Sequence, residues 1–282
     1  MKKQLRKMDV SDYKKIITEM LGYVHKICVE NNIHYFVAYG TLIGAIRHDG
    51  FIPWDDDLDI WMWGEDYDRF IEIFTKSTSD YYILNADNSP YYYHQMTRIC
   101  SKAGISKLKG VIDIDNLGPF VDIFVIYRAP EDAAERLKLY TSIKAANGDI
   151  KYSLPLRYYR TLTFKGKIKS AVRILKRLKK RHSVGTQKLK EARKQLITKY
   201  ENTNSDLYYV AFDSKKTTDQ YRLYTRKQIE EVELHKFEDI EVFIPAAYDE
   251  ILTRIYGDYM KLPPVEKRVT KHHFTPYWRE DE

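Results

Sequence analysis

The chain has 282 residues, of which 44% are hydrophobic, and its formal net charge is +7 at pH 7. This hydrophobic content excludes a chain that is disordered throughout, and it supports one large core or two modest ones. No run of about 18 apolar residues occurs and no apolar stretch follows the polar residues 1–10, so we expect neither a membrane-spanning helix nor a secretory leader, and we predict a cytoplasmic protein.

The first half of the chain alternates predicted helices and strands. Hydrophobic spacing predicts helices at residues 11–32, 42–46 and 65–76. Alternating or continuous β-prone runs predict strands at residues 34–39, 57–63, 81–86, 91–100 and 120–127. This order favours a mixed sheet flanked by helices.

The second half is expected to be mostly helical. It contains a predicted helix at residues 131–146, a basic and charged segment at 165–200, the strand EDIEVFIP (238–245) and the helix AAYDEILTRIY (246–256). The tail after Gly257 is expected to contain little regular structure. We therefore predict an α+β fold with two parts, residues 1–130 and a mostly helical region at residues 131–282.

One window, residues 39–60, reads YGTLIGAIRHDGFIPWDDDLDI and combines three chemically distinct parts. The first is a turn at Gly40 and Thr41 between a strand and a helix, where glycine permits close backbone approach and the helix N-terminus offers amides to a phosphate. The second is the pair Arg47 and His48, whose positive charge can neutralise phosphate oxygens. These four residues are therefore candidate phosphate contacts.

The third part is an acid cluster formed by Asp55, Asp56, Asp57 and Asp59. Asp57 and Asp59 lie two residues apart on a predicted strand, so their carboxylates project from one face and repel each other unless a cation joins them. Mg²⁺ suits such oxygen ligands and leaves positions for phosphate, and Mn²⁺ is an alternative. Asp122, in the apolar run FVDIFVIY, is the candidate third ligand. The alternatives to a metal site are a solvated acidic loop for the acid cluster and a position at the edge of a strand for Asp122.

These segments carry a family resemblance. The stretches GTLIGAIRH (40–48) and PWDDDLDI (53–60) resemble the signature of the LicD family, whose eukaryotic relatives include the fukutin-type proteins. The segment at 244–264 is similar to the family's closing motif, and the run around Asp122 is similar to another of its motifs. Residues 130–235 match no motif of the family.

The resemblance implies a nucleotidyltransferase-type fold, with residues 1–130 as the catalytic core and the C-terminal region completing the site. It implies that Gly40 and Thr41 replace the glycine-serine turn of that superfamily. Asp57 and Asp59 would be the metal-binding and catalytic acid pair, and Asp122 the third carboxylate. The interval between the turn and the acids is longer than in many superfamily members, so a pairing of Asp57 with the aspartate at position 55 stays open.

The resemblance also implies an activity. Family members are similar in transferring phosphocholine from CDP-choline, or polyol phosphates from CDP-polyols, onto glycans. We therefore expect a Mg²⁺-dependent phosphotransferase that uses a CDP-activated donor and releases CMP. The acceptor would be a sugar hydroxyl of a lipid-linked or other cell-surface glycan, such as lipopolysaccharide or a teichoic acid precursor. Two alternatives stay open: a nucleotidyltransferase that moves NMP itself, and a non-catalytic glycan- or nucleotide-binding protein.

The positive charge is concentrated in the segment at residues 165–182. Nine Lys and Arg residues and no acid lie between Lys165 and Arg181, and apolar residues recur at helical spacing. Such a basic helix can lie on an anionic membrane surface, which predicts peripheral contact with the inner face of the plasma membrane. A plain solvated helix is the rival interpretation. No nucleic-acid-binding motif is present, so no nucleic-acid partner is expected.

A choline group would need aromatic rings around it, because a quaternary ammonium cannot donate a hydrogen bond. Trp54, Trp61, Trp63 and the tyrosines at 91–93 are available. Aromatic residues at strand spacing are more often part of a core, so no cage is predicted. In the tail, Arg268, His272 and His273 would bind phosphate only if the tail closes over the site.

Overall fold

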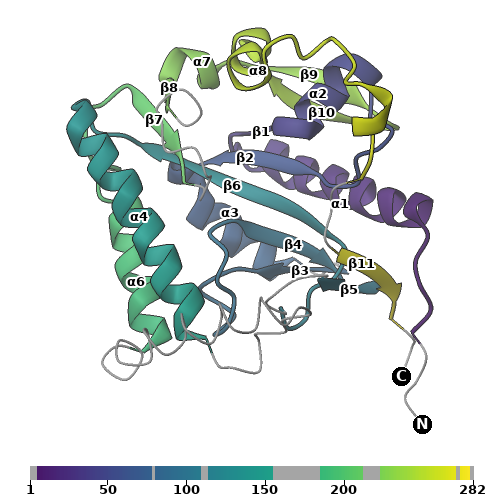
Figure 1. Cartoon of the computed structure of the whole chain (residues 1–282), viewed down its shortest axis with the longest axis horizontal. Coiled ribbons are helices and arrows are strands. Elements are labelled where there is room, and N and C mark those ends of the chain that lie inside the picture. Colours follow the sequence, from purple (N-terminus) through teal and green to yellow (C-terminus); the bar gives the residue numbers. More distant parts are fainter. Residues whose placement is uncertain are drawn as a thin grey trace.

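The computed structural model describes residues 5–77, 80–108, 114–154, 185–211, 223–270 and 274–279. Its centre is a seven-stranded sheet (Figure 1) with the order β1-β2-β6-β4-β3, which β7 and β8 extend from β6. The strands are β1 (Tyr35–Val37), β2 (Asp59–Trp63), β3 (Tyr81–Leu84), β4 (Thr97–Ser101), β6 (Phe120–Arg128), β7 (Leu207–Val210) and β8 (Leu223–Thr225). β2 runs parallel to β6, and the other pairs in this sheet are antiparallel.

Helices α1 (Val10–Glu30) and α3 (Gly64–Lys76) pack their apolar sides into the main core. Each helix buries residues three and four apart, such as Phe70 and Phe74 of α3, which is the spacing of one helical face. The same core receives Leu58, Ile60 and Met62 from the segment that leads into and forms β2. α1 and α3 therefore cover the side of the sheet to which these three residues point.

The opposite side of β2 is aromatic. Trp61 and Trp63 belong to a second core cluster, in which their rings lie 4.9 Å from Tyr224 and 4.8 Å from Tyr208. The cluster is completed by residues of two C-terminal helices, α7 (Arg226–Glu230) and α8 (Tyr248–Tyr256). The alternation predicted for this strand is confirmed, since successive side chains enter different cores.

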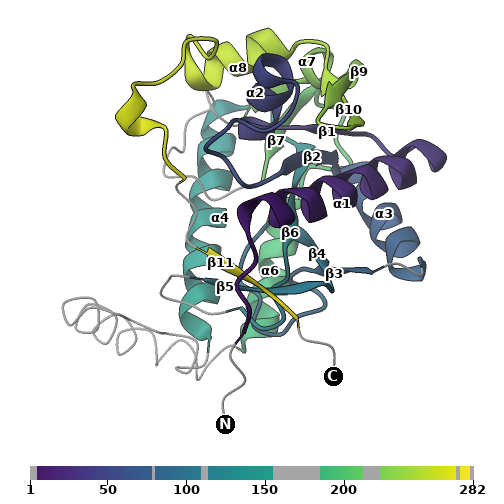
Figure 2. The same cartoon turned by 90° about the vertical axis from the view of Figure 1, so that its right-hand side faces the viewer.

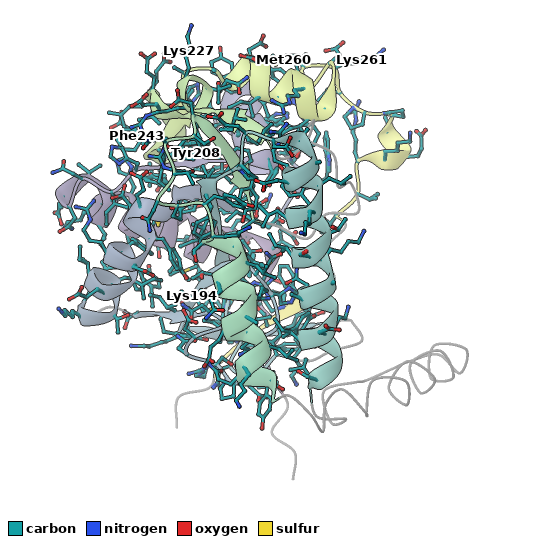
Figure 3. The ribbon with its side chains drawn as sticks, turned by 90° about the vertical axis from the view of Figure 1, so that its left-hand side faces the viewer. Lys194, Tyr208, Lys227, Phe243, Met260 and Lys261 are labelled. Atoms are coloured by element: carbon teal, nitrogen blue, oxygen red, sulfur yellow. The ribbon has the colours of Figure 1, made fainter. Side chains whose placement is uncertain are left out.

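A pair of helices, α4 (Ala133–Ser153) and α6 (Thr186–Ile197), packs beside the sheet. Figure 3 shows them from their own side, with Lys194 on α6. Two buried cations of α6 hold the loop between β3 and β4. Lys190 donates to the carbonyls of Ala86 and Ser89, and Arg193 donates to those at residues 93 and 94. The predicted strand at 91–100 is therefore a loop as far as residue 96, and β4 begins at Thr97.

The C-terminal part forms one end of the molecule together with α2 (Tyr39–His48), at the top of Figure 1. This end holds α7, α8 and the hairpin of β9 (Val232–Phe237) and β10 (Ile240–Pro245). After α8 the chain forms a short 3₁₀ helix, η3 (Val265–Lys267), and then β11 (Phe274–Trp278), which pairs with β5 (Gly104–Leu108). The prediction of little regular structure after Gly257 is wrong here, because β11 depends on a partner strand far away in the sequence.

The α+β class with a mixed sheet and flanking helices is confirmed. The helical character of the second half is less clear, because its described residues contain five strands, β7 to β11, beside four α-helices. The boundary at residue 130 stays a prediction, and β7 and β8 from beyond it belong to the main sheet. The basic segment at 165–182 lies outside the described residues. Across the described parts of the chain, no helix has the length and apolar character needed to cross a membrane.

Candidate active site

The pocket that collects the predicted acids lies where β2 and β6 begin. Asp59 and Asp122 are register partners on these parallel strands, so their backbones are about 4.8 Å apart and their side chains share one face. Asp57 and Asp55 come from the loop that precedes β2. All four carboxylates line one pocket of about 640 Å³. We call Asp57, Asp59 and Asp122 the floor of this pocket.

The expectation that Asp57 and Asp59 lie on one strand is corrected by the position of Asp57. β2 begins at Asp59, because residues 52–55 form a turn in which Asp55 N donates to Ile52 O at 2.8 Å. Asp57 nevertheless reaches the same pocket. Since Asp55 lines the pocket as well, the pairing of Asp55 with Asp57 stays open.

Asp122 forms a buried ion pair that sequence reasoning missed. Arg98 Nε donates to Asp122 Oδ1 at 2.7 Å, and the two residues are register partners on β4 and β6. Both are more than 90% buried. Burial alone would lower the pKa of Arg98, but the charge of Asp122, the nearby Tyr92 and the hydrogen bond to Asp122 together outweigh burial and raise that pKa. The ion pair therefore fixes the orientation of Asp122 and favours its charged form.

Gly40 and Thr41 lie in the first turn of α2, beside the floor. Thr41 Oγ1 accepts a hydrogen bond from Asp59 N at 2.8 Å, so this hydroxyl supports the start of β2. Gly40 lines the pocket, and a Cβ there would come within 2.6 Å of Asp55 Oδ2. Glycine is therefore needed for the close approach of α2 to the acids, and the phosphate-binding role of both residues stays a prediction.

Arg47 and His48 occupy the other end of α2 and do not line the pocket. Arg47 donates to Tyr259 O and, through Nε, to His48 Nε2 at 3.0 Å. Burial and then the nearby positive charge of Arg268 lower the pKa of Arg47. The structure therefore places this pair beside the C-terminal chain rather than at the acids, and a phosphate contact by Arg47 or His48 stays a prediction.

The C-terminal residues 256–270, which we call the rim segment, complete the pocket. Tyr256, Pro263, Lys267 and Val269 line it. Thr270 Oγ1 donates to Trp54 O at 3.0 Å, and the guanidinium of Arg268 lies 5.6 Å from the Trp54 ring centre. The tail therefore closes one side of the site at least as far as residue 270, while His272 and His273 lie outside the described residues.

The pocket wall also carries aromatic rings. Tyr39, Trp54, Phe124 and Tyr256 line it. Tyr39 has a backbone φ of 50°, which is rare for a bulky residue, and its ring packs 5.3 Å from that of Phe124. The pKa of Tyr256 is raised, first by the burial of its hydroxyl end and then by the carboxylates of the pocket, although 47% of the residue is exposed. Among the tryptophans considered from the sequence, Trp61 and Trp63 are buried in the second core cluster, and Trp54 reaches the pocket.

The floor is the candidate metal site. Within the described ranges, no three His, Cys, Asp or Glu side chains are arranged so that they already form a metal site. Asp57, Asp59 and Asp122 still share one pocket, and Mg²⁺ is commonly bound by one or two carboxylates together with substrate phosphates. These oxygen donors are of the type that Mg²⁺ or Mn²⁺ prefers, and metal binding at the floor stays a prediction.

Sequence reasoning missed Arg98, Tyr39 and Lys267, and it left open whether the tail with Arg268 closes over the site. Arg98 lies at a loop-to-strand boundary with no motif around it, and only its register with Asp122 reveals its role. The rim is distant in sequence from the acids that it faces. Its signals were the resemblance of residues 244–264 to a family motif and the basic residues of the tail, including Arg268, and neither gave a contact.

Comparison with known proteins agrees with this arrangement. Residues 32–159 match the family described as LicD/FKTN/FKRP, nucleotidyltransferase domain. The lipopolysaccharide cholinephosphotransferase LicD of Haemophilus influenzae is 29% identical over 274 residues, which cover 95% of this chain and 97% of that protein. An uncharacterized protein of Rickettsia prowazekii is 31% identical over 110 residues, which cover 32% of this chain and 41% of that protein. Residues 32–159, somewhat less than half of the chain, therefore match a LicD-type nucleotidyltransferase domain, and nearly the whole chain is similar to a LicD cholinephosphotransferase.

Proposed function

We propose that this enzyme transfers phosphocholine, or a related phospho-substituent, from a CDP-activated donor to a sugar hydroxyl of a cell-surface glycan and releases CMP. The observation that carries the proposal is the single pocket that combines the three floor carboxylates with an aromatic wall. The near full-length similarity to a protein named lipopolysaccharide cholinephosphotransferase supports phosphocholine as the group and a lipopolysaccharide-type glycan as the acceptor. A teichoic acid precursor is a second possible acceptor of the same chemistry.

In this proposal Asp57, Asp59 and Asp122 hold Mg²⁺ together with the donor's pyrophosphate. Bound there, the ion would neutralise the charge that develops on the phosphate oxygens during in-line displacement. Arg98 holds Asp122 as a charged carboxylate, and a carboxylate in such an ion pair is a weak base. The proton of the attacking hydroxyl therefore passes to another carboxylate of the pocket.

Lys267 would position the phosphate of the donor, and the aromatic wall would position its head group. Lys267 is the one cation among the described residues that line the pocket, and it would contact phosphate. Tyr39, Phe124 and Tyr256 offer ring faces and edges near carboxylates, an environment that attracts a quaternary ammonium and suits a neutral polyol less well. Choline is therefore the head group that this wall favours.

The direct test is CMP release from CDP-choline, CDP-ribitol and CDP-glycerol, with and without Mg²⁺, in the presence of a glycolipid extract as acceptor. We expect metal-dependent CMP release, with CDP-choline preferred, and a loss of about 100-fold or more in Asp59→Asn, because a charged group in a transition-state site is worth that much. Asp56→Asn is the matched control, since Asp56 is in the same acidic string but does not line the pocket.

Other outcomes would contradict the proposal in different ways. Pyrophosphate release from CTP, with transfer of CMP to an acceptor and no use of CDP donors, would show that the nucleotidyltransferase alternative is correct. No turnover of any donor, together with binding of nucleotide or glycan, would show a binding protein. Equal activity of Asp59→Asn and Asp56→Asn would show that the floor is misassigned.

A further inference from the structure

The rim segment carries an unusual share of the exposed apolar side chains. Nine large hydrophobic residues are exposed in the described parts of the chain, and five of them lie between residues 256 and 269. These five are Tyr256, Met260, Leu262, Val265 and Val269, with exposed fractions from 43% to 73%. The other four, Val10, Val29, Leu137 and Leu234, are scattered over α1, α4 and β9. A concentrated apolar patch of this kind marks an interaction surface more often than isolated exposed residues do.

The patch is attached to the mouth of the pocket. Tyr256 and Val269 belong both to the patch and to the pocket lining. Arg268 Nε donates to Pro263 O at 2.8 Å, which closes the chain around η3. Figure 2 shows this part of the chain standing out from the body beside α2 and α8, and Figure 3 shows Met260 and Lys261 at the outer surface. A surface that binds here would therefore present its own groups to the pocket.

The rim segment contains three cations and two acids, Asp258 and Glu266, so it carries an excess of one positive charge. Lys261, Lys267 and Arg268 lie among the apolar residues, and none of the salt bridges found among the described residues involves them. Arg47 adds another cation close to Arg268. Apolar side chains interleaved with Lys and Arg are typical of protein surfaces that insert shallowly into anionic lipid.

We propose that the rim segment is a membrane-contacting surface that docks the enzyme on anionic lipid, so that a lipid-anchored acceptor enters the pocket from the bilayer. The lipid contact stands on the patch and its charges alone. The delivery of the acceptor rests on the proposed function. In this arrangement the apolar residues Met260, Leu262 and Val265 enter the interfacial layer, and Lys261 and Arg268 contact lipid phosphates.

The test is flotation of the full chain with vesicles of phosphatidylcholine, with and without phosphatidylglycerol. We expect binding to the anionic vesicles that weakens as salt is raised. The triple variant Met260→Asp, Leu262→Asp and Val265→Asp should bind at least about tenfold more weakly, since it removes three apolar contacts and adds three like charges to those of the lipid. Leu137→Asp combined with Leu234→Asp is the matched control and should bind as the wild type does, because both leucines are 55% exposed elsewhere on the surface.

Each contrary result overturns the proposal in a distinguishable way. Absence of wild-type binding, or equal binding by the triple variant, would remove the rim as a lipid contact. Loss of binding only when lysines within residues 165–182 are changed to Glu would assign the contact to that segment. Wild-type dimers that the triple variant abolishes, without vesicle binding, would identify the rim as an interface between copies.

CMP release separates this proposal from the proposed function. The three substituted residues do not line the pocket, so with a detergent-solubilised acceptor the triple variant should release CMP at the wild-type rate. With the acceptor embedded in anionic vesicles its rate should fall at least about tenfold, in line with binding. Vesicle binding without CMP release from any donor would leave the lipid contact standing and contradict the proposed function. Equal rates of wild type and triple variant on embedded acceptor would contradict the delivery of the acceptor by the rim.

Discussion

The floor and the rim face each other across one pocket but are built in different ways. Asp59 and Asp122 are fixed by neighbouring strands in the middle of the sheet, and Arg98 from a third strand anchors one of them. The rim segment is irregular, exposed and linked to the pocket through a few contacts such as Thr270 with Trp54. Rigid placement suits chemistry, for which small displacements are costly, whereas an adaptable edge suits the recognition of large acceptors.

The largest effect should come from breaking the support of the floor. Arg98→Met leaves the carboxylate of Asp122 buried without its cation, so we expect the free energy of unfolding to fall by about 3–5 kcal/mol in urea titrations. Lys76→Met, which removes the exposed pair with Glu72, should have a much smaller effect. Combining Arg98→Met with Asp122→Leu should recover part of the loss. A loss in Arg98→Met as small as that in Lys76→Met would show that the buried pair does not stabilise the floor.

The next effect separates chemistry from stability at the floor itself. Asp122→Asn keeps an oxygen for Arg98 but removes the negative charge, so we expect CMP release to fall about 100-fold, which corresponds to about 2.7 kcal/mol. Stabilisation of the protein by Mg²⁺ in a thermal melt should also be lost. A variant with normal Mg²⁺ stabilisation and normal turnover would exclude Asp122 from the metal site.

A smaller effect is expected at the rim. Lys267→Ala removes the cation that lines the pocket, so KM for the CDP donor should rise about tenfold, as for one charge-assisted hydrogen bond, with little change in kcat. Lys261→Ala, in the same segment but outside the pocket lining, is the control and should leave KM unchanged in a soluble assay. If kcat fell while KM stayed constant, Lys267 would act in the transition state, and the division between floor and rim would be wrong.

The smallest effect concerns pH. Burial, followed by the positive charges of Arg98, Lys151 and Arg193, holds the pKa of His94 well below 6.5. The unfolded chain therefore binds the extra proton first as pH falls below about 6.5, so this histidine stabilises the fold above that pH and loses its contribution below it.

We therefore expect His94→Gln to flatten the fall in unfolding free energy between pH 6.5 and 5 by about 1 kcal/mol per pH unit. His235→Gln, the same substitution on β9, is the matched control. Urea titrations at a series of pH values measure both variants. Identical slopes for the two variants would contradict the assignment of a depressed pKa to His94.

The carboxylates of the floor could be predicted from the sequence, because the patterns that reveal them are local. The acids at 55–59 follow a glycine turn and a predicted helix, and Asp122 stands out as a lone charge in an apolar strand. These features predicted which carboxylates the structure collects in one pocket, although not that β2 begins only at Asp59. Local patterns report spacing along one element, which is why these residues were found.

The role of Arg98 and the contacts of the rim could not be predicted from the sequence, because they depend on pairings between distant segments. Arg98 reaches Asp122 because β4 and β6 pair in a register that places the two residues opposite each other. β11 forms by pairing with β5. The separation of Arg47 and His48 from the acids follows from the length of α2, since opposite ends of a ten-residue helix are far apart. The sequence places these residues in one motif, whereas the helix places them at two different surfaces.

The position of the acids in the sheet has a consequence for hydrogen exchange. β2 and β6 are interior strands with partners on both sides, and amides of such strands usually exchange only through global unfolding. The backbone amides next to Asp59 and Asp122 should therefore be among the slowest to exchange with deuterium, and those of residues 257–264 among the fastest. Activity that disappears on warming before the slow amides begin to exchange would then report opening of the rim while the catalytic acids are still in place.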